Sequence, residues 1–169
     1  MVMKPKLPPL LVRADADGAR GIGHVLRSLA LAHAWHGQGG RVEFLTAHPT
    51  LALRQRMESA GATVSEVAHA CPAAVEIELT LATIARLGFD SAALPWVILD
   101  GYHFTPTYQE AIRRSGCRLL VIDDTAQLTR YDADIVLNHG ALAPRLEYRV
   151  NADAWLLLGT RYALLRAEF

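Results

Sequence analysis

Residues 96–101 read Trp-Val-Ile-Leu-Asp-Gly, and residues 119–124 read Leu-Leu-Val-Ile-Asp-Asp. Each stretch is a short, continuous apolar run followed by at least one acidic residue. A run without polar alternation is typical of a strand buried on both faces, as in a parallel sheet. The runs at 135–137 and 155–158 follow the same pattern, and the first of them ends in Asn138. These stretches predict strands of one sheet whose carboxyl ends carry polar residues.

Short apolar runs alternate with longer helical patterns along the rest of the chain. Further strands are expected at 10–12, at 42–45 and from 63 onward, and helices at 24–35, 51–60, 73–87 and 107–114. This alternation is the signature of βαβ units. We therefore predict an α/β fold, a Rossmann-like and mostly parallel sheet with helices on both faces, formed by a single domain over residues 1–169.

The composition describes a globular chain without an extended charged surface. Its 169 residues are 51% hydrophobic, and 17 Lys and Arg balance 17 Asp and Glu. Zero net charge argues against nucleic acid or anionic membrane as a partner, and no apolar stretch reaches the ~20 residues that span a bilayer. Cys71 and Cys117 are too few for a disulfide framework and lack zinc-ligand spacing. We expect a cytoplasmic protein without a metal or cofactor.

The carboxyl ends of the strands are the expected place for a ligand, because ligands of open α/β sheets bind in the crevice beyond them. His24, Tyr102, Asp123 and Asn138 could all approach this rim. The loop at residues 15–24 also reaches it, and its glycines allow a ligand to approach the backbone closely. The loop matches neither a P-loop nor a dinucleotide-binding fingerprint.

His24 opens the first expected helix, where we expect its imidazole to face the crevice. A helix N-terminus disfavours the imidazolium, so His24 is a candidate neutral base; the alternative is a histidine that only caps or packs. Asp123 and Asp124 are adjacent and point to opposite faces, so we expect one to cap the following turn and the other to face the crevice. Tyr102 could stack on a sugar or a base, or simply close its loop.

Several segments together resemble the UDP-sugar hydrolases of the pseudaminic acid pathway. The opening of that family is matched by Arg13-Ala14-Asp15, Gly21-Ile22-Gly23-His24 and the residues up to Ala32. Residues 100–102, 122–124, 134–138 and 158–169 match later segments in the same order. The resemblance covers nearly the whole chain.

This resemblance implies the N-terminal half of a GT-B-type architecture that hydrolyses UDP-2,4-diacetamido-2,4,6-trideoxy-β-L-altropyranose. Water would attack the anomeric carbon with inversion, and UDP would leave without need of a metal. The resemblance implies that His24 is the base and that Tyr102 and Asn138 line the sugar pocket. It also implies a substrate-binding role for the loop that contains Asp15, Gly21 and Gly23.

The chain departs from the family mainly in length, because it stops at residues 167–169, which normally lead into a second Rossmann-like half. We therefore expect a C-terminal nucleotide-binding domain as a partner, little turnover by this chain alone, and exposed apolar surface on the crevice side that permits self-association. Two other functions remain open: the acceptor-side domain of a GT-B glycosyltransferase, and a non-catalytic interaction domain of the same fold.

Overall fold

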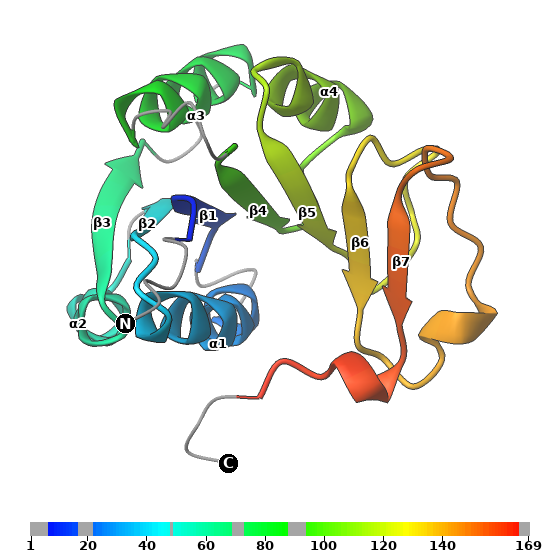
Figure 1. Cartoon of the computed structure of the whole chain (residues 1–169), viewed down its shortest axis with the longest axis horizontal. Coiled ribbons are helices and arrows are strands. Elements are labelled where there is room, and N and C mark those ends of the chain that lie inside the picture. Colours follow the sequence, from blue (N-terminus) through cyan, green and yellow to red (C-terminus); the bar gives the residue numbers. More distant parts are fainter. Residues whose placement is uncertain (1–6, 17–21, 48, 69–72, 88–93, 166–169) are drawn as a thin grey trace, which may run out of the picture.

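One seven-stranded sheet runs through the middle of the protein (Figure 1). The computed structural model describes residues 7–16, 22–47, 49–68, 73–87 and 94–165. All neighbouring strands are parallel, and their order is β3-β2-β1-β4-β5-β6-β7. The strands are β1 (Leu10–Ala14), β2 (Val42–Ala47), β3 (Ala62–Val67), β4 (Trp96–Asp100), β5 (Arg118–Ile122), β6 (Ile135–Asn138) and β7 (Trp155–Leu158).

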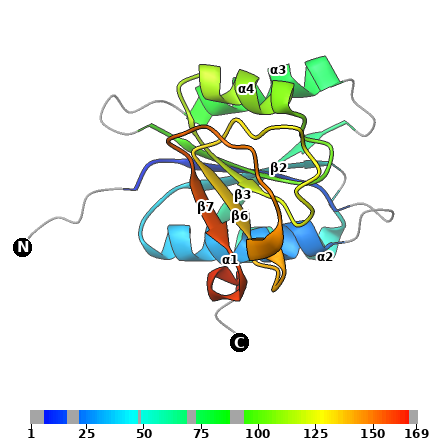
Figure 2. The same cartoon turned by 90° about the vertical axis from the view of Figure 1, so that its right-hand side faces the viewer.

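Helices cover both faces of the sheet, as Figure 2 shows in edge-on view. One face is covered by α1 (Gly23–Gly37) and α2 (Leu51–Ser59), and the other by α3 (Ala73–Leu87) and α4 (Pro106–Arg114). Successive strand side chains point to opposite faces, so the strands supply two separate buried clusters, one beneath each pair of helices. The predicted Rossmann-like sheet with helices on both faces is confirmed.

Two of the helices, α2 and α4, begin where a threonine side chain caps them. The Oγ1 of Thr50 accepts a hydrogen bond from the amide of Leu53, and that of Thr105 accepts one from the amide of Tyr108, both at 3.3 Å. The sequence pattern predicts that α4 begins at residue 107, but the helix begins one residue earlier, at Pro106. Proline suits the first position of a helix.

The alternation of strands with helices stops after β5. Between β5 and the last described residue the chain forms no α-helix, only 3₁₀ turns at Ala143–Arg145 and Thr160–Tyr162. The connection from β5 to β6 begins with a tight turn, because the Asp123 carboxylate accepts hydrogen bonds from the amides of Thr125 and Ala126 at 2.7 and 3.2 Å. Asx turns of this kind compete with helix formation.

The connections leave the sheet in opposite directions at its centre. β1 leads to α1 on one face, whereas the neighbouring β4 leads to α4 on the other (Figure 1). In open α/β sheets such a switch point opens a place for ligands beyond the strand ends. The carboxyl ends of β1 and β4 are therefore the part of the fold that positions a site.

A buried charge cluster fixes β1 to α3 close to this point. Arg13 is 1% exposed, and its guanidinium donates to Glu76 Oε1 at 3.0 Å and to Asp15 Oδ2 at 2.9 Å. Its charge also lies 5.4 Å from the centre of the Phe104 ring. Burial opposes ionisation of Asp15, but the hydrogen bond and charge of Arg13 outweigh it and lower the pKa of that carboxyl below its ordinary value. The Arg13 cluster therefore depends on an ionised Asp15.

Asp15→Asn is expected to lower the free energy of unfolding at pH 7 by about 3–5 kcal/mol, because it leaves buried Arg13 with an incomplete set of carboxylates. The pKa of Asp15 is lower in the folded than in the unfolded chain. Its contribution is therefore complete above the ordinary value of 3.8 and is lost as the pH falls through the lowered folded value.

Urea unfolding of the wild type and the variant at pH 7 and at about pH 3 measures this difference. The gap between the two proteins should narrow in acid. The exposed Asp153 provides a control, since Asp153→Asn should change little at either pH. A gap for Asp15→Asn that is equal at both pH values contradicts the assignment.

Candidate functional site

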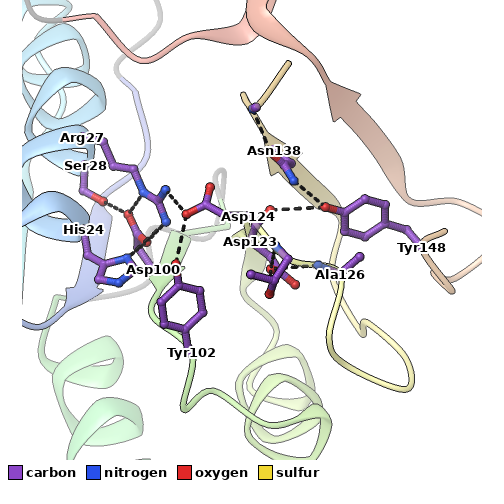
Figure 3. Close-up of polar contacts among 12 residues, drawn as sticks. His24, Arg27, Ser28, Asp100, Tyr102, Asp123, Asp124, Ala126, Asn138 and Tyr148 are labelled. Atoms are coloured by element: carbon purple, nitrogen blue, oxygen red, sulfur yellow. Dashed lines mark hydrogen bonds and ion pairs between the residues drawn. The ribbon is translucent and has the colours of Figure 1, made fainter. Parts of the chain in front are cut away.

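His24 lies in the first turn of α1, next to the carboxyl end of β4. Its Nδ1 is 2.7 Å from Oδ1 of Asp100, the last residue of β4 (Figure 3). The Tyr102 ring packs against the imidazole in an edge-to-face arrangement, with ring centres 5.0 Å apart and planes at 81°. The histidine is 7% exposed, so its ring is more enclosed than a crevice-facing position predicts. The structure thus brings His24 and Tyr102 together.

Asp100 has no exposed surface and is the centre of a hydrogen-bond cluster. Arg27 donates to its two oxygens, from Nε at 2.7 Å and from a terminal nitrogen at 2.5 Å. Ser28 Oγ donates at 3.0 Å. Arg27 and Ser28 follow His24 by three and four residues, so one face of α1 carries all three side chains.

Arg27 connects this cluster to the end of β5. Its other terminal nitrogen donates to Asp124 Oδ2 at 2.5 Å. Burial opposes the charge of Arg27, but the hydrogen bonds and charges of Asp100 and Asp124 outweigh it and raise the pKa of the guanidinium. Figure 3 shows Arg27 lying between the two carboxylates. We call His24, Arg27, Ser28, Asp100 and Asp124 the Arg27 cluster.

Tyr102 stands at the rim of the Arg27 cluster. Its side chain is 49% exposed, and its hydroxyl donates to Asp124 Oδ2 at 3.4 Å. Burial and the charge of Asp124 raise the pKa of the phenol above its ordinary value. The half-exposed ring can contact a ligand while its hydroxyl remains fixed.

Asp123 and Asp124 divide their roles as the sequence predicts. Asp123 is buried and caps the turn after β5, where Ala126 takes a left-handed conformation with φ of 53°. Tyr131 also donates its hydroxyl to the Asp123 carboxylate. Asp124 points the other way and binds Arg27. Only Asp124 therefore belongs to the candidate site.

Asn138 ends β6 and is directed to a different set of partners. It is 1% exposed. Its Oδ1 accepts from the amide of Gly140 at 2.8 Å, and its Nδ2 donates to the Tyr148 hydroxyl at 2.8 Å. Figure 3 shows it turned toward Tyr148 and away from His24. The structure does not join Asn138 to the Arg27 cluster, and its place in a sugar pocket stays a prediction.

The loop residues predicted to bind substrate are placed in different ways. Asp15 is buried among its ion-pair partners, and its carboxylate accepts a hydrogen bond from the amide of Ala47 at 2.8 Å. These contacts hold the chain in place directly after β1. A Cβ at Gly23 would meet no described atom within 4 Å, so packing does not require glycine there. Gly21 lies outside the described residues.

Sequence reasoning missed three members of the Arg27 cluster. Arg27, Ser28 and Asp100 were not among the predicted site residues. The spacing of Arg27 and Ser28 from His24 was a usable signal, because side chains three and four residues apart share a helix face. The pairing of α1 with Asp100, more than seventy positions away, becomes visible only in the fold.

The described residues give no indication of a metal centre or a membrane span. Among them, no three His, Cys, Asp or Glu side chains are grouped so that they could hold a metal ion. In the same part of the chain, no helix is long and apolar enough to cross a bilayer.

Arg27→Ala is expected to lower the free energy of unfolding by about 3–5 kcal/mol, because it leaves the carboxylate of Asp100 buried without its cation. Arg114→Ala is the control, since Arg114 also pairs with a carboxylate, that of Glu110 one helical turn earlier, but is 77% exposed and should contribute little. Urea unfolding of both variants makes the comparison. Equal losses would show that the guanidinium does not stabilise buried Asp100.

Comparison with known proteins shows the fold but not the family. No protein-family model matches the chain, and no curated protein matches it. MurG from Acinetobacter baumannii is a structural neighbour, with a TM-score of 0.54 and 16% sequence identity. The match covers 90% of this chain but 45% of MurG, so the chain spans less than half of its neighbour. The chain therefore has the fold of one half of a GT-B-type architecture.

Proposed function

We propose that this chain is the acceptor-side half of a GT-B-type enzyme that transfers a sugar from UDP to an oxygen nucleophile. The observation that carries the proposal is the position of His24, which lies with its carboxylate partner at the switch point between β1 and β4. Ligands of open α/β sheets bind at this point. The likeness to MurG, a GT-B glycosyltransferase acting on a UDP-sugar, supports the same function.

The proposed reaction needs one proton acceptor. The oxygen of the nucleophile forms a bond to the anomeric carbon as the bond from that carbon to the phosphate oxygen breaks. UDP leaves with the electron pair, and the proton of the nucleophile passes to His24. General-base help of this kind contributes about 10²–10⁴-fold. The anionic leaving group needs stabilisation of its charge more than a proton.

The nucleophile distinguishes the two enzymatic alternatives. A sugar hydroxyl would make the chain part of a glycosyltransferase, which is the function that the structural neighbour favours. Water would make it part of a hydrolase of UDP-2,4-diacetamido-2,4,6-trideoxy-β-L-altropyranose in pseudaminic acid biosynthesis, and this narrower proposal is supported by the sequence motifs around His24 and Tyr102. Both alternatives use His24 in the same role.

A second domain is part of the proposal. The chain matches less than half of MurG, and exposed apolar side chains follow the carboxyl ends of three strands, at Ile22, Tyr102 and Leu142. A nucleotide-binding C-terminal half would cover this edge of the sheet and hold UDP.

The low cysteine content of the chain favours a reducing compartment, so we propose that the protein is located in the cytoplasm.

The test supplies a nucleotide-binding half in trans and incubates the pair with UDP-sugar, with and without acceptor sugars. A new glycoside identifies the transferase, and free reducing sugar in the absence of an acceptor identifies the hydrolase. His24→Ala should slow either reaction by about 10²–10⁴-fold.

His33→Ala is the matched control, because His33 lies on the same helix but is exposed and should leave the rate unchanged. If His24→Ala reacts as fast as the wild type, His24 is not the base. If neither product forms with any UDP-sugar, the remaining alternative is a non-catalytic interaction domain. The chain alone should turn over slowly, and a rate of ~1–10³ s⁻¹ without the second half would contradict the proposal.

A further inference from the structure

The buried carboxylate of Asp100 is fully occupied by donors. Oδ1 forms hydrogen bonds with Nδ1 of His24 and with a terminal nitrogen of Arg27. Oδ2 accepts hydrogen bonds from Arg27 Nε and from Ser28 Oγ. An ionised carboxylate can be buried only when it is paired and hydrogen-bonded. Two donors at each oxygen meet this requirement, and the guanidinium of Arg27 supplies the opposite charge.

This arrangement determines which nitrogen of His24 carries the proton. A carboxylate oxygen only accepts hydrogen bonds, and a guanidinium nitrogen only donates them. Nδ1 lies 2.7 Å from Asp100 Oδ1 and 3.1 Å from the terminal nitrogen of Arg27. That nitrogen already donates to Asp100 Oδ1 at 2.5 Å. The shorter contact therefore makes Nδ1 a donor to Asp100 and not an acceptor from Arg27.

We infer that Asp100 is a positioning residue that holds His24 as the Nδ1–H tautomer, with Nε2 as the proton acceptor. No described residue forms a hydrogen bond with Nε2. The Tyr102 ring packs against the imidazole in an edge-to-face arrangement and limits its rotation. The use of Nε2 as a catalytic base rests on the proposed function, whereas the tautomer itself does not.

Nitrogen NMR of the ¹⁵N-labelled full chain tests the tautomer without any substrate. Long-range correlations from the ring protons distinguish a protonated ring nitrogen from an unprotonated one. The spectrum is recorded at a pH where the ring is neutral, and the His24→Gln variant assigns the signals. The expected result is a protonated Nδ1 and an unprotonated Nε2 in His24. Exposed His33 serves as an internal reference and should show the Nε2–H form that free imidazole side chains prefer.

Two matched variants separate positioning from a general loss of structure. Asp100→Asn and Asp124→Asn each remove a carboxylate that binds Arg27, but only Asp100 contacts His24. Asp100→Asn should lower the Nδ1–H fraction of His24, because asparagine is uncharged and one of its two polar atoms is a donor. Asp124→Asn should leave the tautomer as in the wild type.

A wild-type His24 that is mainly Nε2–H overturns the inference, even if Asp100→Asn fails to fold. Equal tautomer changes in the two variants overturn it as well. With a nucleotide-binding half present, Asp100→Asn should slow turnover by about 10²–10⁴-fold, and adding His24→Ala should cost little more, because the two residues act as a unit. An Nδ1–H tautomer without any turnover leaves the inference intact and counts against the proposed function alone.

Discussion

The buried carboxylate of Asp100 is the constraint on which this edge of the sheet depends. It ends the central strand β4 with no exposed surface, so its charge can exist there only with donors around it. All of the donors come from the first two turns of α1, through His24, Arg27 and Ser28. The position of α1 over the sheet and the orientation of the imidazole are therefore fixed by the same set of bonds.

The proposed chemistry depends on the bonds by which Asp100 fixes both α1 and the imidazole of His24. A base must be held against a ligand with a defined nitrogen facing it, and the rigid strand end gives this precision better than a loop would. Tyr102, half exposed and hydrogen-bonded to Asp124, borders the same position. Many activities share one architecture, so the surface on which the nucleophile binds decides between water and a sugar hydroxyl.

Most of the fold could be predicted from the sequence, because continuous apolar runs such as 96–99 have few alternatives to a buried parallel strand. The connections after β5 could be predicted only in part, since the sequence indicates that one of Asp123 and Asp124 caps the following turn but does not indicate the 3₁₀ turns at Ala143–Arg145 and Thr160–Tyr162. Of the site, His24 and Tyr102 followed from their places after strand ends. The roles of Arg27 and Asp100 depend on a contact between distant segments, and the amide of Asn138 is taken by Tyr148, which no local pattern indicates.

The short loop after β4 links two networks that the sheet would otherwise keep apart. Tyr102 contacts the Arg27 cluster, whereas the next residue, His103, has its Nε2 3.6 Å from the Asp15 carboxylate and 3.7 Å from that of Glu76. The loop is tightly packed, because a Cβ at Gly101 would lie 3.1 Å from side-chain carbons of both His103 and Phe104. Because Tyr102 and His103 are consecutive residues that contact different networks, a backbone shift in this loop displaces a side chain of each network at once.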